Sequence, residues 1–160
     1  MWTKNFITNY IKKLSPIEKI FAEKYTNALK AYFLKEYAEC IKHLEQIEAH
    51  AIKMSIKVKG KYTPVFTKME EIRVYLLKIR ACYEGNGIFR DKLERTCQYF
   101  RRDLEELDSL NDTRKKGYLI FIEFAEKLNA LRFKNTKKNM EEINNLKNNV
   151  QTITLSLIHI

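Results

Sequence analysis

Apolar residues recur every three or four positions along most of the chain, which is the spacing of one face of an α-helix. Clusters of polar residues, glycine and proline interrupt this pattern and divide the chain into about seven predicted helices. Their approximate ranges are 2–14, 16–35, 37–47, 66–83, 89–107, 112–131 and 137–153. The sixth range is apolar nearly all round between Tyr118 and Phe124, so we expect that part to be central and buried.

Several breaks carry recognisable helix start and stop signals. Ser15-Pro16-Ile17-Glu18 combines an N-cap residue, a proline at the first helical position and a glutamate three residues after the cap. Asn111-Asp112-Thr113 supplies N-cap candidates for the sixth helix, and Glu84-Gly85-Asn86-Gly87 is expected to end the fourth. Such signals depend on neighbouring residues only, so they predict helix ends without knowledge of the tertiary structure.

Residues 52–59 have a different pattern, because apolar and polar residues alternate there with the period of a β-strand. A single strand needs a partner for its backbone hydrogen bonds, and no partner stands out in a chain of helical patterns. We therefore expect a frayed helix end followed by a loop through Gly60 and Pro64.

Short connections between consecutive helices predict antiparallel hairpins at about 16–50, 64–107 and 112–153, with an extra helix at 2–14. Three successive hairpins are the organisation of an α-solenoid, in which each pair packs on its neighbour. The chain has 160 residues, with only four glycines and two prolines, so a turn-rich β fold is disfavoured. The prediction is one all-α domain over residues 1–154.

One segment, from Ala28 to Leu44, is similar to a known repeat. Small residues stand where two helices must touch, Tyr37 opens the second helix and Leu44 follows seven positions later. This segment resembles a degenerate tetratricopeptide repeat, with Lys35 where that repeat has glycine and Cys40 where it has alanine. The repeat's tryptophan and terminal proline are missing. The resemblance implies a tetratricopeptide-like stack of hairpins.

Three further runs, at 75–84, 99–104 and 118–124, resemble the C-terminal half of uncharacterised tetratricopeptide-like proteins of Bacteroidetes. That resemblance covers about residues 25–150 and implies a fold without a known activity. Residues 155–160, Leu-Ser-Leu-Ile-His-Ile, equal the translation of an adapter used in transposase-based sequencing libraries. We therefore expect a non-native or disordered tail on a metagenomic fragment; a genuine apolar tail docked on the last hairpin is the alternative.

The formal charge of +10 would suit a nucleic acid, because each cation placed against a phosphate releases counterions. Lysines and glutamates are interleaved along nearly every segment, however, which is typical of solvated helix faces. The best candidate for a basic patch brackets the loop before the sixth helix and consists of Arg101, Arg102, Arg114, Lys115 and Lys116. A nucleic-acid-associated protein is therefore the alternative prediction.

Composition also bears on location. The three cysteines, Cys40, Cys82 and Cys97, are far apart in the sequence and are expected to be buried free thiols in a reducing compartment. Residues 1–14 lack the features of a signal peptide, and no run approaches about 18 apolar residues, the length of a membrane span. A cytoplasmic location without membrane contact is therefore expected.

No set of residues predicts catalysis, a metal site or a cofactor. Cys40 and His43 are one helical turn apart and His50 lies two turns from His43, but only two or three ligands would converge there. The paired glutamates of the chain are sequence neighbours, which point about 100° apart on a helix. The single glycine cluster, residues 84–87, lacks the Lys-Ser/Thr ending of a phosphate loop.

The sequence therefore predicts a protein-protein interaction scaffold without catalytic activity. Its partner, a protein or peptide, would lie in a groove formed by the first helix of each hairpin. The polar positions expected on that groove are Lys24, Lys78 and Arg80. Salt-insensitive capture of an acidic or apolar peptide would favour this function, whereas retention on RNA or heparin that falls steeply with salt would favour the alternative.

Overall fold

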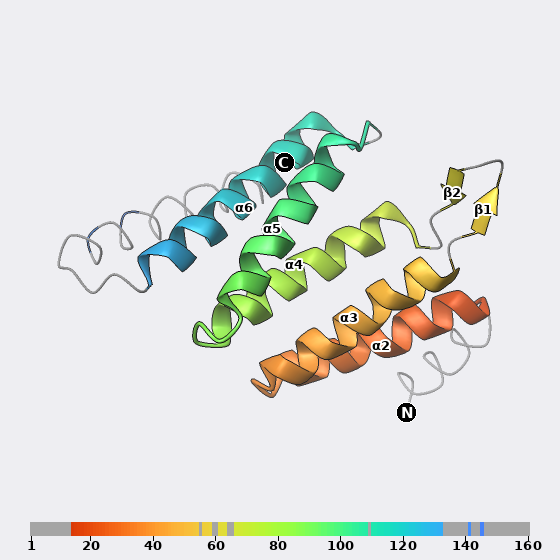
Figure 1. The fold of residues 1–160 in the computed structure, drawn as a ribbon, viewed down its shortest axis with the longest axis horizontal. Coiled ribbons are helices and arrows are strands. Elements are labelled where there is room, and N and C mark those ends of the chain that lie inside the picture. Colours follow the sequence, from red (N-terminus) through yellow and green to blue (C-terminus); the bar gives the residue numbers. More distant parts are fainter. Residues whose placement is uncertain are drawn as a thin grey trace, which may run out of the picture. The chain divides into compact units, whose positions relative to one another are not determined.

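The computed structural model describes residues 14–54, 56–58, 61–63, 66–108, 110–132, 141 and 145. These residues form an all-α fold with one small β-hairpin (Figure 1). Its elements are α2 (Pro16–Phe33), α3 (Tyr37–Met54), β1 (Ile56–Val58), β2 (Lys61–Thr63), α4 (Lys68–Glu84), α5 (Arg90–Glu105) and α6 (Asp112–Leu131). The predicted helix at 2–14, most of the one at 137–153 and the tail at 155–160 lie outside the described residues.

The chain, predicted to be one domain, divides into two compact units. Unit 1 comprises residues 1–88 and contains α2, α3, the β-hairpin and α4. Unit 2 comprises residues 89–160 and contains α5 and α6. The boundary separates α4 from α5, which the sequence predicts to be partners in one hairpin.

Helix α2 begins at the predicted cap and ends at a residue with left-handed backbone conformation. Glu18 N donates to Ser15 Oγ at 3.3 Å and Ser15 N donates to Glu18 Oε2 at 2.7 Å, which confirms the predicted capping box. At the other end Lys35 has a positive φ of 61°, and its N–H donates to Tyr32 O while Glu36 N–H donates to Ala31 O. These two bonds form a Schellman motif, in which the position of Lys35 is normally a glycine.

Helices α2 and α3 form the predicted antiparallel hairpin and bury its predicted apolar stripe. Ala28 and Ala31 of α2 are buried, and their small side chains let the two helix backbones approach closely. On α3 the buried side chains are Cys40, Ile41, Leu44 and Ile47. This packing forms the core of the first hairpin.

Residues 51–63 correct the sequence prediction. Helix α3 continues to Met54, beyond the predicted end near Ile47, and residues 56–58 are a strand and not a loop. Strand β1 pairs antiparallel with β2, in a register that places Val58 opposite Lys61. The prediction found no partner strand anywhere in the chain, but the partner follows after two residues, Lys59 and Gly60, a length typical of β-hairpins.

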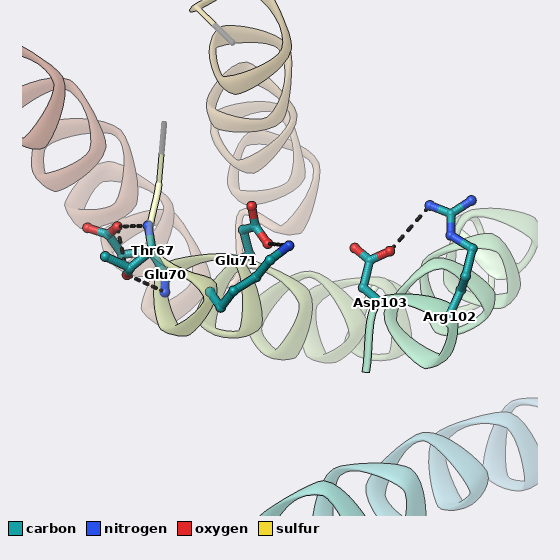
Figure 2. Close-up of polar contacts among 6 residues, drawn as sticks. Thr67, Glu70, Glu71, Arg102 and Asp103 are labelled. Atoms are coloured by element: carbon teal, nitrogen blue, oxygen red, sulfur yellow. Dashed lines mark hydrogen bonds and ion pairs between the residues drawn. The ribbon is translucent and has the colours of Figure 1, made fainter. Parts of the chain in front are cut away.

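Helix α4 starts with a second capping box, which the sequence analysis missed. Thr67 N donates to Glu70 Oε2 at 2.7 Å, and Glu70 N donates to Thr67 Oγ1 at 3.2 Å (Figure 2). The signal was present in the sequence as Thr67-Lys68-Met69-Glu70, a T-x-x-E motif before an apolar run. The helix ends where predicted, because Gly85 caps it and Asn86 and Gly87 both have positive φ.

Helix α4 packs against both helices of the first hairpin. It runs antiparallel to α3 and parallel to α2 (Figure 1). Seven of its residues are buried, and they include Val74, Leu77 and Ala81. These three lie off the stripe that the apolar spacing predicts, which consists of Met69, Ile72, Tyr75, Leu76, Ile79 and Tyr83. Because α4 contacts two helices, it is buried on more of its circumference than a single apolar stripe would cover.

Unit 2 is an antiparallel pair of helices. The buried side chains of α5 and the turn after it include Leu93, Cys97, Phe100, Leu104 and Leu107, which confirms the predicted stripe. Helix α6 starts at the predicted cap, since the Asn111 side chain accepts a hydrogen bond from Thr113 N at 2.8 Å. The prediction that Tyr118 to Phe124 is buried all round was wrong, because Ile122 is the one fully buried residue of that run.

Candidate functional site

The candidate site lies in unit 1, where α2 and α4 run side by side. Phe21 of α2 contacts the ring of Phe66, just before α4, with 5.2 Å between ring centroids. Tyr25 stacks on Phe21 with 5.4 Å between ring centroids and the two rings nearly parallel. Two helical turns further along α2, Tyr32 contacts the ring of Tyr37 edge to face. An aromatic row on α2 therefore borders α4.

Two arginines of α4 lie beside this aromatic row. Arg73 and Arg80 are both exposed and are separated by seven residues, which places them on the same side of the helix. Both interact electrostatically with Tyr25, and Arg80 also with Tyr32. We call the surface formed by Tyr25, Tyr32, Arg73 and Arg80 the Tyr–Arg face.

The tyrosines of the Tyr–Arg face stay protonated over a wide pH range. Partial burial raises the pKa of Tyr25 and of Tyr32 above the ordinary value of 10.0, and this effect exceeds the opposing effect of the arginines. Glu84 of α4 also contributes to raising the pKa of Tyr32. The phenols are therefore neutral near pH 7, where each can donate a hydrogen bond.

The two guanidinium groups of the Tyr–Arg face have no ion-pair partner among the residues that the structure describes. Acidic residues at the start of α4 are engaged elsewhere: Glu70 caps the helix, and Glu71 pairs with Lys68 at 2.7 Å (Figure 2). The arginines therefore keep an uncompensated positive charge on an exposed surface.

The structure separates the three cations predicted for the partner groove. Arg80 belongs to the Tyr–Arg face. Lys24 is half-exposed on α2, but as the neighbour of Tyr25 it points about 100° away from it. Lys78 is buried, and its ammonium group lies 2.6 Å from Glu48 Oε2 and 3.9 Å from Glu45 Oε1 of α3. Lys78 therefore forms an ion pair between α4 and α3 and is not available to a partner.

Sequence reasoning missed Arg73, the second cation of the face. Its distance of seven residues from Arg80 is a signal that the sequence contains, because residues seven apart share one helix face. The burial of Lys78 also has a signal. Val74 and Cys82, four residues before and after it, are buried, and together the three form a stripe on α4.

The predicted basic patch in unit 2 is largely neutralised. Arg101 pairs with Glu126 at 2.7 Å. Arg102 pairs with Asp103 at 3.3 Å (Figure 2). The Arg102 guanidinium also lies over the ring of Tyr99. Lys115 donates to the Glu105 carbonyl at the end of α5. Arg114 and Lys116 are exposed.

The whole stretch that contains this basic patch carries no net charge. Residues 99–118 include five basic and five acidic side chains. A phosphate backbone approaching the patch would therefore meet as many negative as positive groups.

The residues with potential for covalent or metal chemistry are dispersed. Burial raises the pKa of the Cys40 thiol from 9.0 to about 11, so the thiol is protonated near pH 7 and is a poor nucleophile. His43 Nδ1 and His50 Nε2 are buried without a hydrogen-bond partner in the described part of the chain, and the two residues are about 10 Å apart along α3. No three metal-binding side chains cluster among the described residues.

Within the described ranges, no helix has the length and apolar character needed to cross a membrane. The chain matches no protein-family model, no curated protein and no solved structure.

Proposed function

We propose that this protein is a scaffold of the tetratricopeptide-like class that binds another protein, without catalysing a reaction, in the cytoplasm. In this proposal its helical hairpins stack as a short α-solenoid. The first helices of successive hairpins, α2 and α4, provide the surface for the partner.

The arrangement of unit 1 supports this proposal. Stacked hairpins require the first helix of one pair to run parallel to the first helix of the next, and α4 runs parallel to α2 (Figure 1). The second helix of the first pair, α3, packs against α4 from another side through the buried Lys78 and its pairing with Glu48. The exposed arginines of α4 and the half-buried tyrosines of α2 then lie on the surface that we assign to the partner.

The observation that carries the proposal is the composition of the Tyr–Arg face. Tyrosine and arginine are among the residue types most enriched at the energetic centres of protein interfaces, because each combines a large contact area with hydrogen-bonding groups. Here two of each lie together, with the tyrosines half-buried and therefore held in place. Binding a partner would therefore cost little side-chain entropy at the two tyrosines.

The alternative function, association with nucleic acid, is supported by the overall charge of +10. It is weakened by the pairing of Arg101 and Arg102 with acidic neighbours and by the neutral stretch at 99–118. Nonspecific affinity for RNA that disappears at moderate salt is all that this charge distribution predicts.

A selection from a random peptide library displayed on phage tests the proposed function. We expect enriched peptides to bind the purified protein, and the exchange of both Tyr25 and Tyr32 for alanine to weaken them about tenfold or more. The matched control is Tyr99→Ala, which removes an exposed tyrosine of unit 2. The proposal would be contradicted if no peptides were enriched, or if Tyr99→Ala weakened peptide binding as much as the exchange of Tyr25 and Tyr32. RNA binding with a steep salt dependence would contradict it as well.

A further inference from the structure

We propose that the segment bound at the Tyr–Arg face is an acidic, extended peptide whose two carboxylates lie three residues apart. This inference rests on the proposed function, and it specifies the chemistry of the partner. It is carried by the unpaired charge of Arg73 and Arg80, by their spacing along α4 and by the neighbouring tyrosines.

The charge of the two arginines selects for carboxylates. Both side chains are exposed, and neither forms an ion pair with any residue in the described ranges. Guanidinium and carboxylate groups form two parallel hydrogen bonds, which makes such a pair both stronger and more directional than a single contact. Glu84, one helical turn after Arg80, interacts with Tyr32 and makes no ion pair with Arg80 among the described residues.

The spacing of the arginines fits an extended peptide with acids three residues apart. Seven residues of α-helix correspond to about 10 Å along the axis, since each residue rises about 1.5 Å. An extended polyproline II segment has three residues per turn and rises about 3.1 Å per residue, so side chains three positions apart share a side at roughly 9 Å. Side chains on one side of a β-strand are spaced at about 7 Å or 13 Å, which fits less well.

The tyrosines suit the remainder of such a peptide. Tyr25 and Tyr32 are also seven residues apart, on the helix parallel to α4, so the two rows have the same repeat. Both rings are half-buried, and their neutral phenols can donate to peptide carbonyl groups, which an extended segment leaves free. Proline-containing extended segments also dock on aromatic rings in other recognition modes.

A direct binding experiment tests this inference with synthetic peptides. The probe is a fluorescein-labelled dodecapeptide rich in proline and alanine, with glutamates at positions 5 and 8, measured by fluorescence anisotropy at two salt concentrations. One comparison peptide has glutamine at both positions, and a second has its glutamates adjacent. We expect the glutamine peptide to bind at least about tenfold more weakly than the probe. The peptide with adjacent glutamates should bind at least about threefold more weakly than the probe.

Protein variants locate the binding. The double variant Arg73→Gln, Arg80→Gln should weaken the acidic peptide about tenfold or more. The matched control is the double variant Lys19→Gln, Lys30→Gln, which removes the same amount of charge. Both lysines are exposed and lie on the side of α2 opposite the buried Ala28. This control should change the affinity for the acidic peptide by less than about twofold. All four positions are exposed, so both double variants should retain the melting temperature of the parent protein.

The outcomes separate this inference from the proposed function. Equal binding of the glutamate and glutamine peptides, no binding of either, or equal loss in the two double variants would overturn the inference. Equal affinity for adjacent glutamates would overturn the spacing. If library peptides bind through Tyr25 and Tyr32 but lack acidic residues, the scaffold function stands and its acidic specificity fails.

Discussion

Helices α4 and α5 are both rich in cations, but several of their arginines differ in whether a carboxylate lies beside them. On α5, Arg90, Arg101 and Arg102 each have a carboxylate within 3.3 Å, supplied by α5 itself or by α6. On α4, the exposed Arg73 and Arg80 have no such partner among the described residues. The number of positive residues in a segment therefore says little about its binding capacity; what matters is which acids the fold places beside them.

The two helices also differ in how they are buried. The buried residues of α5 lie on one stripe, as expected for a helix that packs mainly against one neighbour, α6. Helix α4 packs against α2 and α3, and its buried positions include a lysine. A single hydrophobic stripe therefore predicts α5 well and α4 poorly.

The largest expected effect tests the packing of α5 on α6. Phe100 is completely buried, and its ring lies 5.8 Å from that of Tyr118 on α6. Phe100→Ala should lower the free energy of unfolding by about 3–5 kcal/mol, because it removes a large side chain and leaves a cavity. Urea denaturation followed by circular dichroism measures the loss, and hydrogen exchange should locate it in α5 and α6.

Tyr99→Ala is the matched control for this change, because Tyr99 is adjacent to Phe100 but is 50% exposed. It should cost less than about 1 kcal/mol, including the loss of its contact with Arg102. A similar cost for both variants would contradict the packing of this hairpin. Loss of protection in α2 and α3 on Phe100→Ala would show that the two units unfold as one.

The next effect concerns the buried cation of α4. Lys78→Ala leaves Glu48 without its partner, and we expect a loss of about 1–3 kcal/mol, limited because Glu48 remains partly exposed to water. Arg80→Ala, two residues later on the exposed side, should change stability by less than about 0.5 kcal/mol. Thermal and urea unfolding of the two variants measures this contrast within one helix.

A double-mutant cycle sharpens the same contrast. Lys78→Ala and Glu48→Ala should be coupled by about 1 kcal/mol or more, because their charged groups are 2.6 Å apart. Lys78→Met keeps the apolar stem of the lysine and should cost less than the alanine variant. Additive effects in the cycle would mean that the pair does not hold α4 against α3.

Local signals explain which parts of this structure the sequence predicted. The capping box of Ser15 and Glu18, the stop at 84–87 and the Asn111 cap each depend on a few consecutive residues. The stripes of α3 and α5 were confirmed because each helix buries mainly one face. These features are encoded within a single turn or a single periodic pattern.

Features that depend on a second element could not be predicted in the same way. The β-hairpin depends on pairing between Ile56–Val58 and Lys61–Thr63. The alternating pattern of the first strand does not by itself identify the second strand. The burial of Lys78 depends on Glu48, which lies 30 residues earlier on another helix. The Tyr–Arg face likewise requires α2 and α4 to be parallel neighbours, which periodicity within either helix does not reveal.

A pH-dependent effect distinguishes the core of unit 1 from its surface. Burial raises the pKa of Cys40 from 9.0 to about 11, so between these values the folded protein holds a proton that the unfolded chain releases. The Cys40 contribution to stability is therefore complete below pH 9 and is lost as the pH rises through about 11. Urea unfolding at pH 8, 9, 10 and 11 measures this effect. The free energy of unfolding should fall more steeply with pH for the parent protein than for Cys40→Ala. Parallel curves for the two proteins would contradict the burial of this thiol.

The smallest effect compares two residues with left-handed backbone conformation, Lys35 after α2 and Asn86 after α4. A side chain at such a position is strained, and glycine relieves the strain, whereas asparagine tolerates this conformation better than lysine does. Lys35→Gly should therefore stabilise unit 1 by up to about 1 kcal/mol, and Asn86→Gly by a few tenths. Lys35→Ala removes the same side chain without relieving the backbone, so it should not raise the melting temperature. If Lys35→Ala raised the melting temperature as much as Lys35→Gly, the backbone strain of the Schellman turn would not limit stability at this position. The charge of the lysine would be the cause instead.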